Sequence, residues 1–131
     1  RHGIRFEADD DTRLSEMPKF GEFMEHEEIA SIANFVRSLS GKEHDEAAAA
    51  AGTELFADNC ASCHGETGAG DREQGAPNLT DAIWLYGSKE DVIEKSITYS
   101  RAGVMPAWQG RITDAQIRQV AFYVHQLGGG E

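Results

Sequence analysis

The stretch that decides the fold is Cys60-Ala61-Ser62-Cys63-His64, which holds both cysteines of the chain. Two thiols at this spacing can each add to one vinyl group of the same porphyrin, and the histidine that follows can offer a ring nitrogen to the iron. This C-x-x-C-H pattern is the attachment motif of a c-type haem. The sequence therefore predicts one covalent haem c on Cys60 and Cys63, with His64 as an axial ligand.

Two other uses of paired cysteines compete with this interpretation. A C-x-x-C motif also serves thiol–disulfide exchange, so a redox dithiol stays open. A structural zinc site needs four ligands, and the chain has no second cysteine pair to complete one. The adjacent histidine favours haem attachment over both.

Length and composition limit what this chain can build. Its 131 residues suffice for one domain, or for one small domain with an appendage, and 40% of them are apolar. A unit of about 80 residues has a small hydrophobic core. Folds of this size usually need an additional stabilising link, and a covalently bound cofactor supplies one. We therefore expect the haem to form part of the core and the apoprotein to fold poorly.

The charge balance narrows the class of partner. The formal net charge is −11, which argues against nucleic acid because its phosphates would be repelled. An acidic surface suits docking to a basic protein patch at salt-sensitive rates, although solubility alone also explains acidity. No run of the sequence is long and apolar enough to span a bilayer.

The chain contains an internal repeat. Residues 12–20 align without a gap with residues 100–108, and each segment has an arginine ahead of a Met-Pro pair. The agreement continues through a helical pattern in which Ile29, Ala33, Phe35, Val36, Leu39 and Gly41 align with Ile117, Ala121, Tyr123, Val124, Leu127 and Gly129.

The first copy of this repeat lacks a cysteine motif ahead of its Met-Pro pair. We therefore predict that residues 1–41 are the C-terminal remnant of a first, truncated domain. Residues 42–51 are a linker and helix start, and residues 52–131 are a complete domain of the same kind. We expect the chain to be a fragment of a longer, two-haem protein.

The hydrophobic periodicity predicts an all-α fold without a convincing β-strand. We expect one helix over residues 47–62, ending in the haem motif. A second begins at a capping box of Ser88 with Asp91, and the last begins at Thr113 with Gln116. The last helix ends at Gly128–Gly130. Its apolar face consists of Ile117, Val120, Ala121, Val124 and Leu127.

Met105 is the predicted second axial ligand. It precedes Pro106 in a loop between Gly103 and Gly110, just before the last helix. Thioether ligation raises the redox potential of haem iron relative to a second imidazole, whereas core packing is the usual role of a methionine. Met17 holds the equivalent place in the first copy, and we expect it to be a ligand only in a full-length two-haem parent.

Two further residues are candidates for contacts with the haem or its ligand. The carbonyl of Pro77 is predicted to accept a hydrogen bond from the other ring nitrogen of His64, with an ordinary turn as the alternative. Arg101 is predicted to pair with a haem propionate, with a plain surface arginine as the alternative. The remaining histidines are expected at the surface: His2, His26, His44 and His125.

The haem motif, Pro77-Asn78-Leu79 and Met105-Pro106 together resemble the class I cytochrome c domain over residues 52–131. That resemblance implies a small helical fold around a His/Met-ligated haem c, with one haem edge exposed for electron transfer. It carries over Cys60, Cys63, His64 and Met105 as haem-binding residues, together with Pro77.

A wider resemblance covers the whole chain. Five segments carry it: residues 11–18, 75–79, 83–87 (Ile-Trp-Leu-Tyr-Gly), 103–108 and the Gly-Gly-Gly-Glu end at 128–131. They are similar to the dihaem subunit, of CcoP/FixP type, of cbb3-type cytochrome c oxidases. The resemblance implies the periplasmic part of a membrane-anchored subunit in a bacterial inner membrane. The anchor and the first haem motif of that family have no counterpart in these 131 residues.

The function implied is electron relay in a respiratory chain. Electrons pass from a donor cytochrome c toward the other oxidase subunits, of which the catalytic one reduces oxygen to water. Because both axial positions are filled, we expect no catalysis by this chain itself; the oxidase activity belongs to the whole complex. Two alternatives stay open: a free monohaem cytochrome c shuttle, and a haem sensor or enzyme with an open sixth position.

Overall fold

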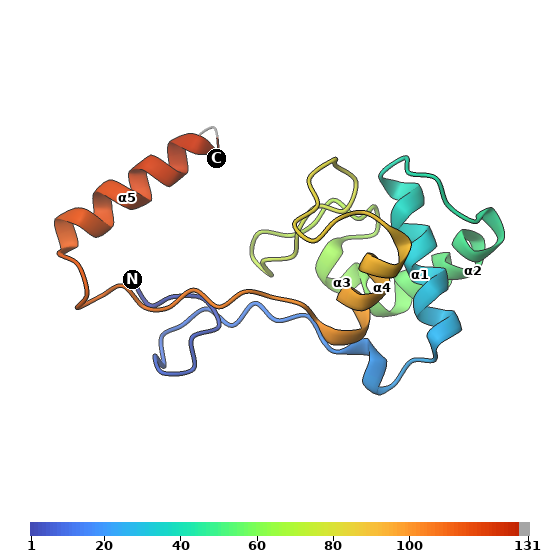
Figure 1. Cartoon of the computed structure of the whole chain (residues 1–131), viewed down its shortest axis with the longest axis horizontal. Helices are drawn as coiled ribbons and strands as arrows, with labels where there is room; N and C mark the ends of the chain where they lie inside the picture. The colour runs from blue at the N-terminus through green and yellow to red at the C-terminus, as the bar shows by residue number, and fades with distance from the viewer. Residues whose placement is uncertain (129–131) are drawn as a thin grey trace. The chain divides into compact units, whose positions relative to one another are not determined.

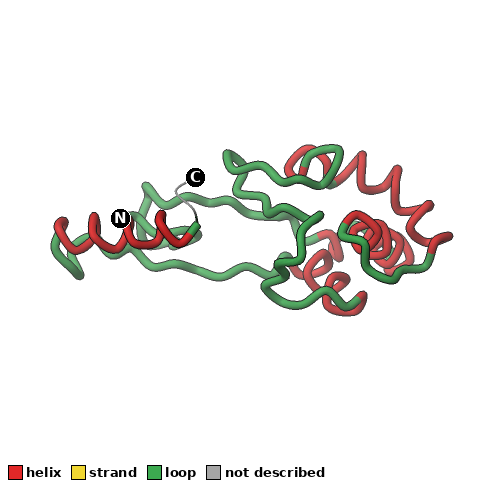
Figure 2. Tube along the Cα trace, turned by 90° about the horizontal axis from the view of Figure 1, so that it is seen from above, coloured by secondary structure: helices red, strands yellow, loops and turns green. Residues whose placement is uncertain are grey.

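The computed structural model describes residues 1–128, and all regular elements in that range are helical (Figure 1). In chain order they are the 3-10 turn η1 (Phe20–Glu22) and the helices α1 (His26–Leu39), α2 (Glu46–Asn59), α3 (Ala61–His64), α4 (Glu90–Tyr99) and α5 (Asp114–Leu127). Figure 2 shows these helices joined by loops, with no strand among the described residues. The predicted all-α class is confirmed.

The chain forms two compact units. We call Glu16–Ala102, which holds η1 to α4, the core unit. We call Arg1–Ser15 together with Gly103–Glu131, which holds α5, the terminal unit. The predicted domain boundaries, after residues 41 and 51, both fall inside the core unit. The division into residues 1–41, 42–51 and 52–131 therefore stays a prediction that rests on the sequence repeat.

Helix α1 forms the centre of the core unit by packing against both α2 and α4. Its N-terminus has a capping box in which Glu25 and Glu28 each bond the other's backbone N–H. Its apolar residues recur on one face, and full burial of each stabilises the unit by about 1.5–3 kcal/mol. The buried core consists of Phe20, Ile29, Ile32, Ala33, Val36, Phe56, Cys60, Ile93 and Ile97.

The crossing of α1 over α2 is close enough to require glycine. A Cβ added at Gly52 would lie 2.1 Å from the carbonyl oxygen of Ser31. Asn34 is also buried, and its side chain makes two hydrogen bonds from α1 to neighbouring segments. Its Nδ2 donates to Glu90 Oε1 (2.8 Å), and its Oδ1 accepts from the backbone N–H of Asp45 (2.9 Å). Backbone proximity and side-chain hydrogen bonds therefore both fix α1 in place.

The helix termini match the sequence predictions in part. Helix α2 begins after Asp45, whose side chain accepts from Ala48 N–H, and it ends at Asn59, so the haem motif forms a separate short helix, α3. The capping box of Thr113 with Gln116 is confirmed at the start of α5. Gly128 is the C-cap of α5, while positions 129 and 130 lie outside the described residues.

The predicted capping box at Ser88 is wrong. The N-cap of α4 is Lys89, which has extended backbone (φ −70°, ψ 149°) and makes no side-chain capping bond. Helix α4 therefore begins at Glu90. Glu90 and Asp91 both fall in its first turn, where negative charge interacts favourably with the helix dipole.

In the terminal unit, two extended segments run side by side. The backbone N–H of Ile4 donates to Met105 O (2.9 Å), and Met105 N–H donates back to Ile4 O (3.0 Å). Gly3 has φ +79°, and a Cβ there would lie 2.2 Å from Met105 O, so glycine is needed on both counts. No residue of α5 is buried, and among the residues of its unit that the structure describes there is no second helix to cover it.

No helix within residues 1–128 has both the length and the apolar character that crossing a membrane demands.

Candidate haem site

One cysteine caps the short helix α3 and the other lies within it: Cys60 is the residue before its first turn, and Cys63 is its third residue. Cys60 ends α2 and begins α3, with its N–H donating to Phe56 O (2.8 Å). Both cysteines are free thiols; Cys60 is buried in the core and Cys63 is half-buried. Burial, with the nearby Cys63 as a smaller cause, raises the pKa of the Cys60 thiol to about 11. This direction is opposite to the lowered pKa that is typical of a reactive thiol in a redox dithiol.

His64 is the last residue of α3 and is buried. Its Nδ1 lies 3.1 Å from the carbonyl oxygen of Pro77, the contact that the sequence predicts. Burial lowers the pKa of His64, while the bond to Pro77 acts in the opposite direction. In a neutral imidazole whose Nδ1–H donates to Pro77, Nε2 keeps its lone pair free for a metal ion.

The loop after α3 holds Pro77 in this position. Gly70 has φ +82°, and a Cβ there would lie 2.7 Å from both Ala76 O and Pro77 C. Asp71 and Ala76 form a pair of backbone hydrogen bonds, and Gly70 N–H donates to His64 O (2.8 Å). The chain therefore returns tightly enough to bring the Pro77 carbonyl to His64.

The donor set of α3 fits a c-type haem better than zinc. It offers two unpaired thiols on one helical turn and an imidazole whose Nε2 is available. Among residues 1–128, the one cluster of His, Cys, Asp or Glu side chains that converges as metal ligands is His2, Asp9 and Asp11, in the other unit. The cysteine pair therefore has no further ligands with which to complete a zinc site.

Trp84 is a residue whose role the sequence did not reveal. It is half-buried against the core, and its buried Nε1–H has no hydrogen-bond partner. A buried donor without an acceptor is rare in proteins. An acidic cofactor group such as a propionate would satisfy it. In the sequence, Trp84 is indistinguishable from an ordinary core aromatic.

Arg101 lies against α4. Its Nη2 donates to Val92 O (2.6 Å) and Ser96 Oγ (2.7 Å), and its guanidinium stacks 4.4 Å from the centre of the Tyr86 ring. These contacts use some of the five N–H donors of its guanidinium group. Pairing with a propionate stays a prediction.

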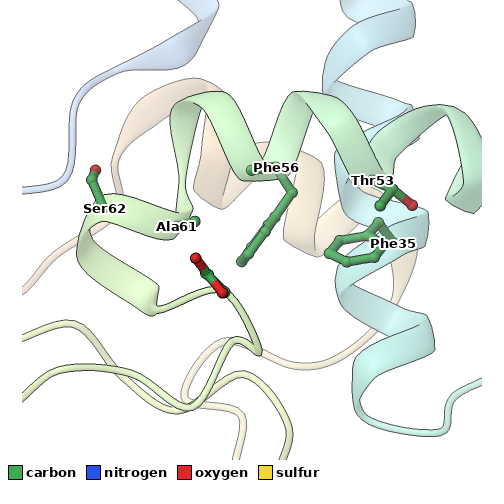
Figure 3. Close-up of a pocket in the computed structure, with 7 residues that line it drawn as sticks. Phe35, Thr53, Phe56, Ala61 and Ser62 are labelled. Carbon is green, nitrogen blue, oxygen red and sulfur yellow. The ribbon is translucent and has the colours of Figure 1, made fainter.

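A hollow of about 570 Å³ opens between α1, α2 and α3 (Figure 3). Phe35 and Phe56 face each other across part of it, with ring centres 5.0 Å apart. The motif residues Cys60, Cys63 and His64 do not line this hollow, so we do not assign it to the haem. Its lining consists of Phe35, Thr53, Phe56, Ala57, Ala61, Ser62 and Glu66.

The two Met-Pro segments belong to different units. Met105 lies in the terminal unit with its side chain 46% exposed. Met17 lies in the core unit, half-buried against the core, and its carbonyl accepts a hydrogen bond from Ser100 Oγ. The assignment of Met105 as the ligand opposite His64 stays a prediction.

The other histidines do not gather at the cysteine motif. His26 and His125 are exposed, and His44 Nδ1 contacts Lys42 O at 2.8 Å. His2 Nδ1 lies 3.3 Å from Asp9 and 3.8 Å from Asp11.

Comparison with known proteins places the chain among oxidase subunits. A family model described as cytochrome c oxidase, cbb3-type, subunit III, matches residues 47–124. The cbb3-type cytochrome c oxidase subunit CcoP of Cereibacter sphaeroides is 54% identical over 132 residues, which cover 99% of this chain and 46% of that protein.

Two other relatives agree. Subunit CcoP of Rhodobacter capsulatus is 48% identical over 141 residues, covering 100% of this chain and 48% of that protein. Subunit FixPc of Rhizobium leguminosarum bv. viciae is 45% identical over 129 residues, covering 98% and 45%. The chain spans about half the length of the curated relatives it matches.

Proposed function

The chain belongs to the family of cbb3-type cytochrome c oxidase subunit III, and we propose that it relays electrons through a c-type haem from a donor cytochrome c to the other oxidase subunits. The observation that carries this proposal is the geometry of α3. One free thiol caps it and another lies within it, and its final residue, His64, is buried with Nδ1 bonded to Pro77.

Cys60 and Cys63 are the residues that would anchor the haem. Each thiol adds across one vinyl double bond, with sulfur bonding to one carbon and the proton going to the other, so no oxidant is needed. When bound, the haem supplies a one-electron ferric/ferrous couple. Because Cys60 is part of the buried core, attachment there ties the cofactor to the packing of α2.

His64 would supply one axial nitrogen. With the Pro77 carbonyl accepting from Nδ1–H, the imidazole would be held in one tautomer and its Nε2 would be left for the iron. This hydrogen bond also increases the basicity of the imidazole.

A methionine from a Met-Pro segment would supply the second axial ligand. Met105 is the proposed one, because it follows the haem motif within the same copy of the repeat. A haem iron held by both His64 and a methionine thioether would have no coordination position left for a substrate. Electron transfer at the haem edge is then the available chemistry. Trp84 Nε1–H and Arg101 are the donors proposed to hold the propionates.

We place the chain on the periplasmic side of a bacterial inner membrane, attached to its complex through an anchor outside these residues. The formal net charge of −11 suits a donor that presents a basic patch. The other subunits of the oxidase complex would be its permanent partners.

A haem count with a carbon monoxide titration tests this proposal. The chain is matured in a bacterial host that attaches haem c, and the pyridine haemochrome is measured per chain. We expect one covalent haem, a low-spin reduced spectrum and little carbon monoxide binding at neutral pH. Absence of covalent haem would overturn the proposal and favour thiol–disulfide exchange as the role of Cys60 and Cys63. Fast, complete carbon monoxide binding would instead indicate a sensor or enzyme with an open position.

A further inference from the structure

The hollow between α1, α2 and α3 lies beside the haem motif without including its cysteines or histidine (Figure 3). Ala61 and Ser62, the two residues between the cysteines of the motif, both line it. Ser62 Oγ also donates to Cys63 Sγ (3.9 Å), and the carbonyl of Phe56, another lining residue, accepts from Cys60 N–H (2.8 Å). A molecule seated in the hollow would therefore lie directly against the backbone that carries both thiols.

The lining of the hollow combines an apolar base with short side chains. Phe56 is 1% exposed, so its ring lies at the base of the hollow. Thr53, Ala57 and Ser62 are exposed, and each has a short side chain. Such a site can receive a protruding side chain from a partner protein, as the central contacts of protein interfaces do.

The chain around the hollow is acidic. Residues 43–71 contain seven Asp or Glu and no Lys or Arg. Glu66 lines the hollow itself, and Glu54 and Asp58 on α2 each directly follow a lining residue. All three are exposed, and none of them has an ion-pair partner among residues 1–128. Their negative charge is therefore available to attract a basic partner.

We propose that this hollow, with Glu54, Asp58 and Glu66 at its rim, is the docking surface for a lysine-rich electron-donor protein. The inference rests on the proposed function, because an electron donor gains from docking here only if Cys60 and Cys63 carry a haem. Lysine side chains of the donor would meet the rim, and a small apolar contact would fill the centre.

The composition of this surface favours a donor over a permanent subunit contact. Permanent interfaces are larger and more apolar, whereas transient complexes use small surfaces. A charged rim also speeds the encounter of partners that must meet and separate repeatedly. The hollow has both features, with carboxylates around a centre of small side chains.

The test is a titration followed by nuclear magnetic resonance on the haem-loaded full chain labelled with ¹⁵N. The probe is a lysine-rich mitochondrial cytochrome c, and both proteins are kept reduced so that binding is measured without electron transfer. We expect the backbone amide signals of Thr53, Ala57 and Ser62 to shift most. The dissociation constant should rise with ionic strength, because salt screens the attraction between the charges.

Two double variants with the same change of net charge locate the charge effect. Glu54→Gln/Glu66→Gln removes charge at the hollow, whereas Glu16→Gln/Glu22→Gln removes charge from exposed residues of the core unit that do not line it. We expect the first to raise the dissociation constant about threefold to tenfold at low ionic strength, as for two exposed ion pairs, and the second to raise it less than about twofold. Equal effects would show that net charge alone matters and would overturn the proposal.

Two single variants test the contact itself. Ala57→Gln adds an uncharged side chain to the lining, and Ala50→Gln adds the same side chain at an exposed position of α2 outside it. Glutamine is a good helix former, so both variants should fold. We expect Ala57→Gln to weaken binding about fivefold, as for the loss of a central contact, and Ala50→Gln to leave it unchanged. Unchanged binding by Ala57→Gln would mean that the donor does not use the hollow.

The same samples separate this inference from the proposed function. Absence of covalent haem would overturn both. Covalent haem together with donor binding that none of these variants alters would overturn the docking surface alone. A third result would also overturn it: if Ala57→Gln in the full-length subunit released the other oxidase subunits without weakening donor binding, the hollow would be a subunit interface.

Discussion

Nδ1 of His64 lies 3.1 Å from the carbonyl oxygen of Pro77, across a loop closed by paired backbone hydrogen bonds between Asp71 and Ala76. The protein alone, through its backbone, therefore sets the orientation of the imidazole. If His64 ligates a haem iron as proposed, an imidazole held in this way would need little reorganisation between the two oxidation states.

Gly70→Ala should disturb this relationship. The new Cβ would lie 2.7 Å from backbone atoms at Ala76 and Pro77, and φ is +82°. We expect a loss of about 1–3 kcal/mol in the free energy of unfolding, from strain and overpacking, and a shifted midpoint potential. Denaturant unfolding and a redox titration measure the two effects.

Gly41→Ala is the control for Gly70→Ala. Gly41 also has positive φ (+65°), but a Cβ there meets nothing within 4 Å. In Gly41→Ala, the free energy of unfolding should fall only by the strain of an alanine at positive φ. The midpoint potential should stay that of the unmodified chain. Equal shifts of potential in both variants would contradict a role for the Pro77 contact.

Gly52→Ala tests whether close helix packing outweighs helix propensity. Propensity alone predicts that alanine in the middle of α2 gains about 0.5–1 kcal/mol. Contact with Ser31 O at 2.1 Å predicts a loss of about 1–3 kcal/mol, because the backbone of α1 must move. We expect the loss, measured by thermal or urea unfolding.

Ala51→Gly measures the propensity contribution separately. Ala51 is exposed on the same helix, so its change to glycine should cost about 1 kcal/mol without any packing effect. A more stable Gly52→Ala chain would show that α1 does not cross α2 at this point.

Cys60→Ser and Cys63→Ser should each leave one thioether. Because one vinyl group then stays conjugated, the pyridine haemochrome band moves to longer wavelength, and mass spectrometry of the denatured chain still finds haem attached. Cys60→Ser should also lower stability more than Cys63→Ser, because only Cys60 lies in the buried core. Normal two-thioether spectra in either variant would remove that cysteine from the site.

Electron exchange with a basic partner should slow as salt is added. The chain has a formal net charge of −11, and its attraction to a basic donor is screened within about 10 Å at 0.1 M ionic strength. Stopped-flow reduction by a basic cytochrome c should fall steeply with ionic strength, while reduction by an uncharged reagent should not. A rate that rises with salt for the basic donor would contradict the expected docking.

Local patterns in the sequence predicted some features that the structure has, including the contact between His64 and Pro77. The C-x-x-C-H spacing placed Cys60, Cys63 and His64 on one helical turn, and the capping box at Thr113 marked the start of α5. The wrong cap at Ser88 shows the limit of such patterns. Lys89 takes the N-cap position through its backbone conformation, which a side-chain motif does not encode.

Which helix pairs with α2 is not a local property, so the sequence did not reveal it. Helices α1 and α5 have similar apolar patterns, and either pattern suits a groove lined by apolar residues. The choice depends on particular contacts, such as that of Asn34 with Glu90, and no residue of α5 is buried. Similarly, the orphaned Nε1–H of Trp84 is visible only once the core is assembled.

The short connection between α1 and α2 has a kinetic consequence. These helices are neighbours in the chain, separated only by residues 40–45, so little loop-closure entropy opposes their pairing. Synthesis also delivers α1 before α2 and α5 last. The α1–α2 hairpin should therefore be complete while the C-terminal copy is still being made.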